Sequence, residues 1–130
     1  MVTIKSCEIF KAVSVEDSAN VIEVAKKLHE FQERRVFVLN SKKYPIGIIS
    51  IVDINDRVVA KAKDLKKTKA KDIMTYPLSL VFDINEDING VANKMLSKNN
   101  FYCPVVDKGI FKGIITYASL LKVFGKKSKS

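Results

Sequence analysis

The sequence is poor in the residues that build disulfide frameworks, zinc sites and membrane spans. It contains two cysteines, one histidine and no tryptophan in 130 residues. Cys7 and Cys103 are too few and too far apart for a disulfide framework or a zinc site, so we expect free thiols in a reducing cytoplasm. No apolar run reaches the roughly 18 residues of a membrane span. The N-terminal residues MVTIKSCEIF also lack the apolar stretch of a signal peptide. We therefore expect a cytoplasmic protein with no membrane association.

Patterns typical of catalysis are also missing. The sequence has no nucleophile–base set, no glycine-rich phosphate loop and no pair of catalytic carboxylates. His29 has no second histidine or cysteine pattern near it, which favours a surface or core-edge residue over a metal ligand. We predict a protein that is not an enzyme, binds no metal and requires no cofactor.

Charge is unevenly distributed. The net charge is +9, and the excess comes from six lysines and one aspartate at 61–71 and four lysines at 122–130. Such lysine runs are typical of solvated surface, and contact with nucleic acid is the alternative. Arginine, which specific nucleic-acid readers place in their contact surface, occurs only three times. The solvated surface is therefore the favoured interpretation.

The strongest positive feature is an internal repeat, because residues 13–60 and 80–124 read as two copies of one unit. The clearest match is Gly47-Ile48-Ile49-Ser50 against Gly113-Ile114-Ile115-Thr116. Upstream, the apolar pattern Val21, Val24, Ala25 and Leu28 matches Ile88, Val91, Ala92 and Met95. Such a repeat predicts two similar units related by a pseudo-twofold axis, with crevices between them that suit a ligand.

Each copy predicts strand, helix, strand, strand, helix, which is an α/β (α+β) fold. In the first copy we expect strands at 12–15, 35–39 and 46–50, and helices at 17–33 and 52–63. The first of these helices has an apolar stripe that ends at Phe31. In the second copy we expect strands at 78–82, 102–106 and 113–116, helices at 87–97 and 118–124, and a helical turn at 72–74 before them. The open sheet faces predict packing of the two repeats sheet to sheet, and remaining apolar helix surface predicts a homodimer.

The order and spacing resemble a tandem pair of cystathionine-β-synthase (CBS) domains, also called a Bateman module. The resemblance rests on Asp72-Ile73-Met74-Thr75, on Pro104-Val105-Val106-Asp107 and on the two glycine-led strands, in register in both copies. On this basis we expect a first repeat at 1–63, a basic linker at 64–71, a second repeat at 72–124 and a disordered basic tail at 125–130. The resemblance implies a regulatory module that binds adenine nucleotides or S-adenosylmethionine and reports to a partner.

The first copy carries a candidate nucleotide site. Asp53 can accept hydrogen bonds from both hydroxyls of a ribose. Ile48 lies in the strand that ends at Ser50, and a helix begins there. Ser50 and the N-terminus of that helix can together hold a phosphate. Arg34 and Arg35, two of the three arginines, supply a cationic clamp. The resemblance implies that Arg35 contacts phosphate and that Asp53 holds ribose. It also implies an adenine slot formed by Thr75, Leu80, Phe101 and Tyr102.

The matching cleft of the second copy is degenerate. Ser119 replaces the aspartate and Phe101 and Tyr102 replace the arginines, whereas Thr116, after Ile114, keeps its type. The structural alternatives remain open: Asp53 can be a helix-start carboxylate, and the arginines can pair with Glu30 or Glu33. Asp53, Ser50 and Arg35 occur together in the first copy and are lost or altered in the second, and this joint occurrence favours binding.

The sequence thus predicts a homodimeric sensor of AMP, ADP or ATP that signals to a separate, unknown effector protein. The arginines disfavour the cationic S-adenosylmethionine, and NAD is also less favoured. One alternative is a nucleic-acid-associated protein that uses the basic linker and tail. The other is a structural dimerisation adaptor without ligand.

Overall fold

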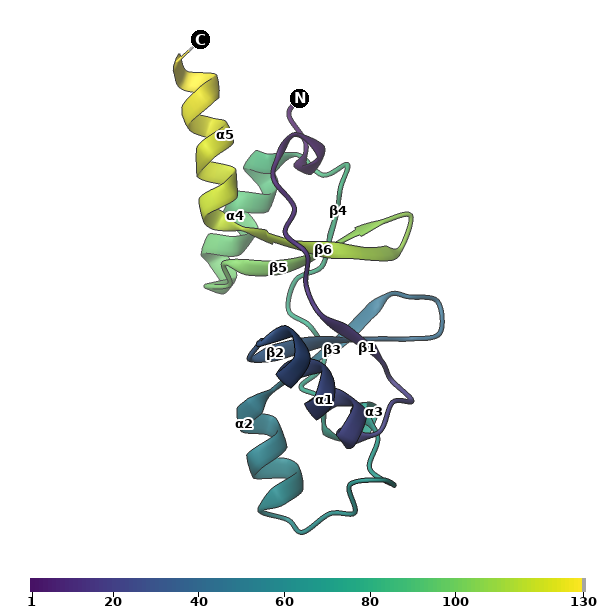
Figure 1. Cartoon of the computed structure of the whole chain (residues 1–130). Coiled ribbons are helices and arrows are strands. Elements are labelled where there is room, and N and C mark those ends of the chain that lie inside the picture. Colours follow the sequence, from purple (N-terminus) through teal and green to yellow (C-terminus); the bar gives the residue numbers. More distant parts are fainter. Residues whose placement is uncertain (130) are drawn as a thin grey trace. The chain divides into compact units, whose positions relative to one another are not determined.

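The computed structural model describes the backbone of residues 1–129 and the side chains of residues 1–125 (Figure 1). The chain forms two compact units, one made of Ala12–Leu78 and the other of Met1–Lys11 together with Ser79–Ser130. We call them the first-repeat unit and the second-repeat unit and describe each by itself.

The first-repeat unit contains one three-stranded sheet and its helices. Its elements are β1 (Ser14–Glu16), α1 (Val21–Phe31), β2 (Arg35–Leu39), β3 (Pro45–Ser50), α2 (Ile51–Ile54), a π-helical turn (Asn55–Val59) and α3 (Ala70–Ile73). Strand β2 lies in the middle, parallel to β1 and antiparallel to β3. The predicted strands therefore lie where the alternation of apolar residues placed them, to within two residues.

Helix α1 is shorter than the sequence predicts at both ends. Asn20, rather than Asp17, is the N-cap, and its side chain accepts a hydrogen bond from the Glu23 amide at 3.0 Å. Asp17 instead donates its amide to the Leu39 carbonyl at 2.9 Å, which extends the sheet. The helix ends at Gln32, whose φ is 53°.

The predicted burial of the end of the apolar stripe of α1 is wrong. Val21, Val24 and Leu28 are buried, but Phe31 is 54% exposed. Ala25 is exposed as well. Because the chain leaves the helix at Gln32, Phe31 has no neighbouring turn to cover it.

The second predicted helix of this unit is also different in detail. It begins at Ile51, and after Ile54 it widens into a π turn in which the Ala60 amide donates to the Asn55 carbonyl at 2.8 Å. The prediction of an α-helix to residue 63 is therefore wrong at its second half. A single π turn leaves no periodic signal in so short a segment.

The segment expected to be a basic linker packs on the first repeat. Thr68 and Ala70 of this segment are buried, as is Ile73 two residues after it. The Val21 amide donates to the Thr68 carbonyl at 2.9 Å, which ties the segment to the start of α1. The short helix expected at 72–74 is present slightly earlier, as α3.

The second-repeat unit repeats the same order of elements. They are a 3-10 turn (Ile4–Ser6), β4 (Phe82–Asp83), α4 (Ile88–Lys98), β5 (Tyr102–Asp107), β6 (Ile110–Thr116) and α5 (Tyr117–Lys129). Strand β5 is parallel to β4 and antiparallel to β6. The fold-class prediction of two β-α-β-β-α repeats is confirmed, and the packing of sheet on sheet about a pseudo-twofold axis stays a prediction.

Two predicted ends in this unit differ. The extended segment expected at 78–82 is a strand only at Phe82–Asp83. The backbone of α5 continues beyond the predicted end at residue 124 as far as Lys129. Disorder of 125–130 stays a prediction, because the side chains of 126–130 and all of residue 130 lie outside the described part of the chain.

The N-terminal segment Met1–Lys11 belongs to the second-repeat unit, whereas the sequence placed it with the first repeat. Ile4 and Cys7 are buried in the core of this unit, against residues such as Phe82, Met95 and Ile115. The Ile4 amide donates to the Glu86 carbonyl at 3.2 Å. Thus the residues before the first repeat pack on the second.

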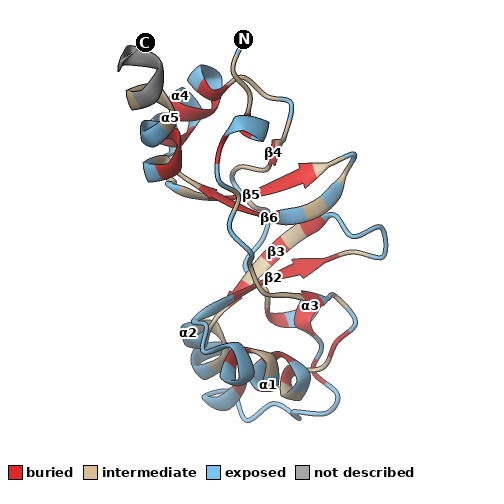
Figure 2. Cartoon of the chain, turned by 45° about the horizontal axis from the view of Figure 1, so that its top comes forward, coloured by how far each residue is buried: buried red, intermediate tan, exposed pale blue. Residues whose placement is uncertain are grey.

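Each unit has its own hydrophobic core between sheet and helices (Figure 2). In the second-repeat unit, α4 buries Ile88, Val91, Ala92 and Met95, which confirms the inward face that the sequence predicts. No helix of the described residues is long and apolar enough to cross a membrane.

Both cysteine thiols are free and buried. Burial raises the pKa of Cys7, and it raises the pKa of Cys103 to about 11. Both thiols therefore stay protonated near neutral pH.

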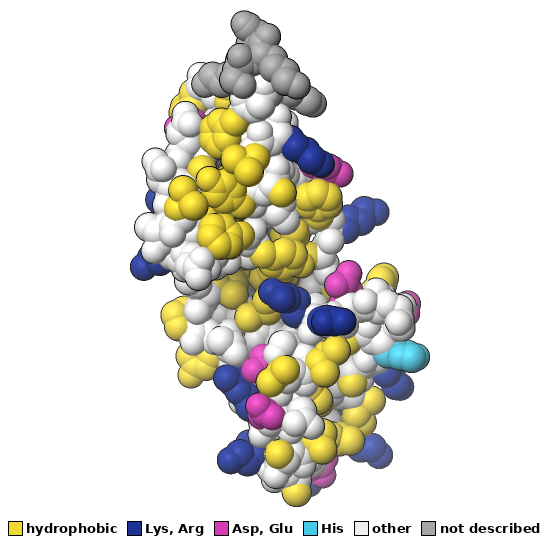
Figure 3. Space-filling view, turned by 90° about the vertical axis from the view of Figure 1, so that its left-hand side faces the viewer, with side chains coloured by type: hydrophobic (Ala, Val, Ile, Leu, Met, Phe, Trp, Pro, Cys, Tyr) yellow, Lys and Arg dark blue, Asp and Glu magenta, His cyan; other side chains and the backbone are white. Residues whose placement is uncertain are grey.

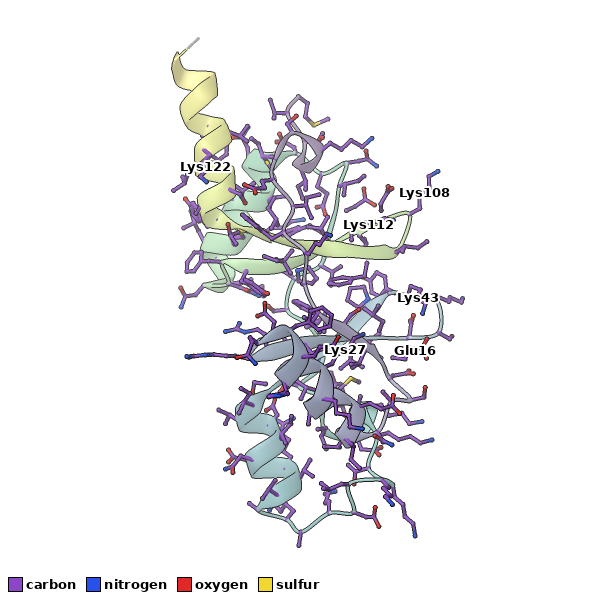
Figure 4. All side chains as sticks on the ribbon, in the orientation of Figure 1. Glu16, Lys27, Lys43, Lys108, Lys112 and Lys122 are labelled. Atoms are coloured by element: carbon purple, nitrogen blue, oxygen red, sulfur yellow. The ribbon has the colours of Figure 1, made fainter. Side chains whose placement is uncertain are left out.

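At the edge of the first-repeat unit, the Glu16 carboxylate accepts a hydrogen bond from Lys43 at 2.9 Å (Figure 4). This hydrogen bond, together with the lysine charge, lowers the pKa of Glu16. Both side chains are exposed, so the pair contributes little to stability.

Candidate functional site

The candidate site is built where β3 passes into α2. Ser50 Oγ accepts a hydrogen bond from the Asp53 amide at 3.1 Å, and the Asp53 carboxylate accepts one from the Ser50 amide at 2.9 Å. This reciprocal pair is a capping box. It fixes a hydroxyl and a carboxylate at the end of the strand, so the structural role expected for Asp53 as a helix-start carboxylate is real.

A segment between the repeats brings Thr75 to the same place. Ile48 and Thr75 form an antiparallel bridge with N–H···O distances of 3.0 and 2.8 Å. The Thr75 hydroxyl lies 3.5 Å from Asp53 Oδ2, at the outer limit of a hydrogen bond. Ser50, Asp53, Thr75 and Ile48, four of the predicted site residues, thus meet within one unit.

Gly47 permits this close approach. A Cβ built on Gly47 would lie 2.5 Å from Met74 Sδ, so any larger residue would have to move Met74. In the second repeat, the matching glycine, Gly113, likewise permits the close approach of another segment. A Cβ on Gly113 would lie 2.2 Å from the Phe10 carbonyl oxygen, and φ there is +141°.

Arg57 is a site residue that the sequence reasoning missed. Its Nε lies 3.7 Å from Asp53 Oδ1, and its Nη1 donates to the Ile73 carbonyl at 2.9 Å. One side chain therefore links the carboxylate to the segment that carries Thr75. The Asp-x-x-x-Arg spacing, which places the two side chains on one helix face, was the available signal.

Arg35 begins β2 beside this site, and Arg34 directly precedes the strand. Arg35 is paired with Ser50 in the sheet register. The Arg34 carbonyl accepts from the Ile51 amide at 3.0 Å. Both side chains are exposed.

Arg34 also lines a surface hollow between α1 and α2 with a volume of about 580 Å³. The hollow is lined by Ala25, Leu28, His29, Gln32, Glu33, Arg34, Ile51 and Ile54. Ser50 and Asp53 are not among these residues, so Arg34 is the predicted site residue that faces this hollow.

The matching position of the second repeat is neutral. Thr116 and Ser119 cap α5 as Ser50 and Asp53 cap α2, with N–H···Oγ distances of 3.1 Å in both directions. Ser119 is only 4% exposed, and its hydroxyl donates to the Thr116 carbonyl at 2.7 Å. No carboxylate stands at residue 119, so this position offers no charged acceptor for a ribose.

Aromatic side chains replace the arginines beside the second position. The Tyr117 amide donates to the Phe101 carbonyl at 3.1 Å, as Ile51 does to Arg34, which shows that the two places correspond. The rings of Phe101 and Tyr117 lie 5.6 Å apart. Ile114 pairs with Phe10 as Ile48 pairs with Thr75.

The residues expected to form the adenine slot are divided between the units. Thr75 lies in the first-repeat unit, and Leu80, Phe101 and Tyr102 lie in the second-repeat unit. A single cleft that combines them with Asp53 stays a prediction.

Comparison with known proteins gives a consistent picture. The family model of the CBS domain matches residues 8–60 and 70–126. An uncharacterized protein of Methanopyrus kandleri is 34% identical over 105 residues, which cover 78% of this chain and 52% of that protein. A CBS domain-containing protein of Arabidopsis thaliana is 26% identical over 92% of this chain and 22% of its own length. The chain therefore spans about half the length of the first relative and about a fifth of the second.

Solved structures have the same fold. Staphylococcus aureus OpuCA is 20% identical, with a TM-score of 0.72 over 92% of this chain and 97% of that one. A CBS domain protein from Pyrobaculum aerophilum, complexed with AMP, is 21% identical, with a TM-score of 0.67 over 99% of this chain and 100% of that one.

Proposed function

The chain belongs to the CBS domain family as a tandem pair, and from this premise we propose that it is a regulatory module that binds an adenine nucleotide. The observation that carries the proposal is the meeting of Ser50, Asp53 and Thr75 at one strand end. The bound AMP of the related Pyrobaculum aerophilum structure supports an adenine nucleotide as the ligand class.

Asp53 is the proposed ribose ligand. A carboxylate has about four lone-pair sites. The Ser50 amide and the Thr75 hydroxyl take two of them on Asp53 Oδ2, and Arg57 Nε lies 3.7 Å from Oδ1, too far for a hydrogen bond. The remaining capacity suits the two hydroxyls of a ribose. Since Arg57 and the Ser50 amide already hold the carboxylate, little ordering is needed on binding.

Arg35 is the proposed phosphate ligand, with Arg34 as its neighbour. Arg35 pairs with Ser50 in the sheet, so its position is fixed relative to the ribose site. A guanidinium attracts phosphate and repels the sulfonium of S-adenosylmethionine. We therefore propose AMP, ADP or ATP ahead of S-adenosylmethionine and NAD. Leu80, Phe101 and Tyr102 are the proposed adenine contacts, and Thr116 and Ser119 mark a cleft without a nucleotide.

The proposed output is a change passed to a separate effector protein. Thr75 and Arg57 connect the Asp53 carboxylate to the segment between the repeats. A ligand that changes the contacts of the Asp53 carboxylate therefore acts directly on the segment that carries Ile73 and Thr75.

We propose that the working form is a homodimer. Large apolar side chains are exposed on the helices of each unit, including Phe31 and Val52 in the first and Leu96 and Leu121 in the second. Figure 3 shows hydrophobic side chains gathered over α4 and α5. Covering such patches with a second copy removes apolar surface from water.

The test compares nucleotide binding by wild type, Asp53→Asn and Asp56→Asn. The Asp53→Asn side chain can still accept a hydrogen bond from the Ser50 amide but carries no charge. Asp56→Asn is the matched control, because it removes one carboxylate from an exposed residue three positions later. A lost charged hydrogen bond of roughly 1.5–3 kcal/mol predicts at least tenfold weaker binding for Asp53→Asn. The readout is calorimetric titration with AMP, ADP, ATP, NAD and S-adenosylmethionine.

Two results would count against the proposal. One is that the wild type binds none of the nucleotides. The other is equal affinity of wild type and Asp53→Asn for the nucleotide that binds. A normal melting temperature of Asp53→Asn is the control for folding, because it separates loss of a contact from loss of structure.

A further inference from the structure

Residues 61–71, the lysine loop, form an exposed cationic surface. The loop contains six lysines and one aspartate, and all six lysine side chains are exposed. Elsewhere the first-repeat unit is nearly neutral, with seven basic and eight acidic residues. The positive charge of the unit is therefore concentrated in this loop.

The loop is a fixed structure rather than a free linker. Asp64 Oδ1 accepts hydrogen bonds from the Lys66 and Lys67 amides at 2.8 and 3.0 Å. The Thr68 amide donates to the Asp64 carbonyl at 3.0 Å, and the Lys71 amide to the Asp17 carbonyl at 3.1 Å. Lysines on an anchored loop lose less conformational freedom on binding than those of a flexible tail.

No lysine of the loop forms an ion pair with another side chain that the structure describes. Ion pairs such as Glu16–Lys43, Asp53–Arg57 and Glu86–Lys94 join side chains outside the loop. Asp64, the acidic residue of the loop, directs its carboxylate to backbone amides. The loop therefore presents six ammonium groups to an anionic partner.

We propose that the lysine loop binds the phosphate backbone of duplex nucleic acid without sequence specificity. Lysine contacts phosphate as a point charge, and release of counterions from a duplex drives binding without any apolar contact. The loop has no aromatic residue on which a base could stack. Attachment to an anionic membrane needs a second, apolar anchor, and the loop's exposed Leu65 is a single small one. This surface is separate from the proposed nucleotide site.

The test compares wild type with two double variants of equal charge. Lys66→Gln/Lys67→Gln removes two loop charges, and Lys26→Gln/Lys42→Gln removes two exposed lysines elsewhere in the same unit. Binding of a fluorescent duplex of about 20 base pairs is measured by anisotropy between about 50 and 200 mM salt. Each phosphate contact contributes about 0.9 to the slope of log affinity against log salt. The loop variant is expected to lower that slope by about 2 and to weaken binding roughly tenfold or more at about 100 mM salt.

Retention of near-wild-type duplex affinity by the Lys26/Lys42 variant, together with the loss in the loop variant, supports the proposal. Equal weakening in both variants would overturn it, because the effect would then be one of overall charge. Absence of duplex binding, or binding only to vesicles that contain phosphatidylserine, would overturn it too. Both variants should keep the melting temperature of the wild type, so a loss of duplex binding is not a loss of fold. The loop lysines are not among the proposed nucleotide ligands, so this outcome does not depend on nucleotide binding.

Discussion

Gly113→Ala and Gly47→Ala should affect stability unequally, although the two glycines occupy matching places in the repeat. At Gly113 the new Cβ would lie 2.2 Å from the Phe10 carbonyl oxygen and 3.1 Å from Ile9 Cγ2. Backbone cannot move aside as the end of a side chain can, so the N-terminal segment must shift away from β6.

The magnitude for Gly113→Ala follows from three losses. An alanine at a φ of +141° is strained by about 1–3 kcal/mol. The two hydrogen bonds between Phe10 and Ile114, both 2.9 Å long, contribute about 1 kcal/mol each. We therefore expect the free energy of unfolding to fall by about 3–5 kcal/mol.

Gly47→Ala should be milder. Its φ is not in the positive region, and its Cβ would meet the side chain of Met74, with Sδ at 2.5 Å and Cγ at 2.9 Å. A methionine has three rotatable bonds and can repack, so overpacking of about 1–2 kcal/mol is expected.

Urea unfolding followed by circular dichroism measures both differences. Gly113→Ala should lower the free energy of unfolding by at least about 1 kcal/mol more than Gly47→Ala. Equal effects, or the reverse order, would refute the argument that pairing of the N-terminal segment with β6 requires a glycine.

Three further predictions concern single side chains. Arg57→Gln should weaken nucleotide binding about fivefold or more in calorimetric titration, because Asp53 loses the charge that orients it; unchanged affinity would contradict this role. Cys103 is buried and its pKa is raised to about 11, so its reaction with a disulfide reagent at about pH 8 should be much slower in the folded chain than in the chain unfolded by urea. Rapid labelling of Cys103 without unfolding would be the contrary result. Ala62→Gly should raise the free energy of unfolding by about 0.5–1 kcal/mol in the same urea assay, because Ala62 has a φ of 52°; a lower stability would refute this.

Most of the local structure could be predicted because it depends on periodic side chains. Strand β2 begins and ends as predicted, and the inward residues of α4 are all buried. The errors lie where backbone geometry prevails over side-chain pattern. Helix α1 ends at Gln32, and Phe31 at its last turn stays exposed. A π turn replaces the second half of the helix predicted at 52–63.

The candidate site shows the same division. Ser50 and Asp53 could be identified because their spacing at a strand end is a capping pattern. Arg57 was missed because its importance lies in its contact with the Ile73 carbonyl, and a backbone acceptor has no sequence signature.

The sequence by itself determined the repeat, the family and the chemical difference between Asp53 in one copy and Ser119 in the other. The tertiary structure decided which segments each repeat gathers around it. Residues 1–11 pack on the second repeat, and the segment around Thr75 packs on the first, through the bridges Phe10–Ile114 and Ile48–Thr75. Such bridges join backbone groups that every residue type except proline has in full. The geometry of the folded chain therefore decides which backbone groups form these bridges. The need for glycine at the bridged strands can likewise be recognised only in the tertiary structure.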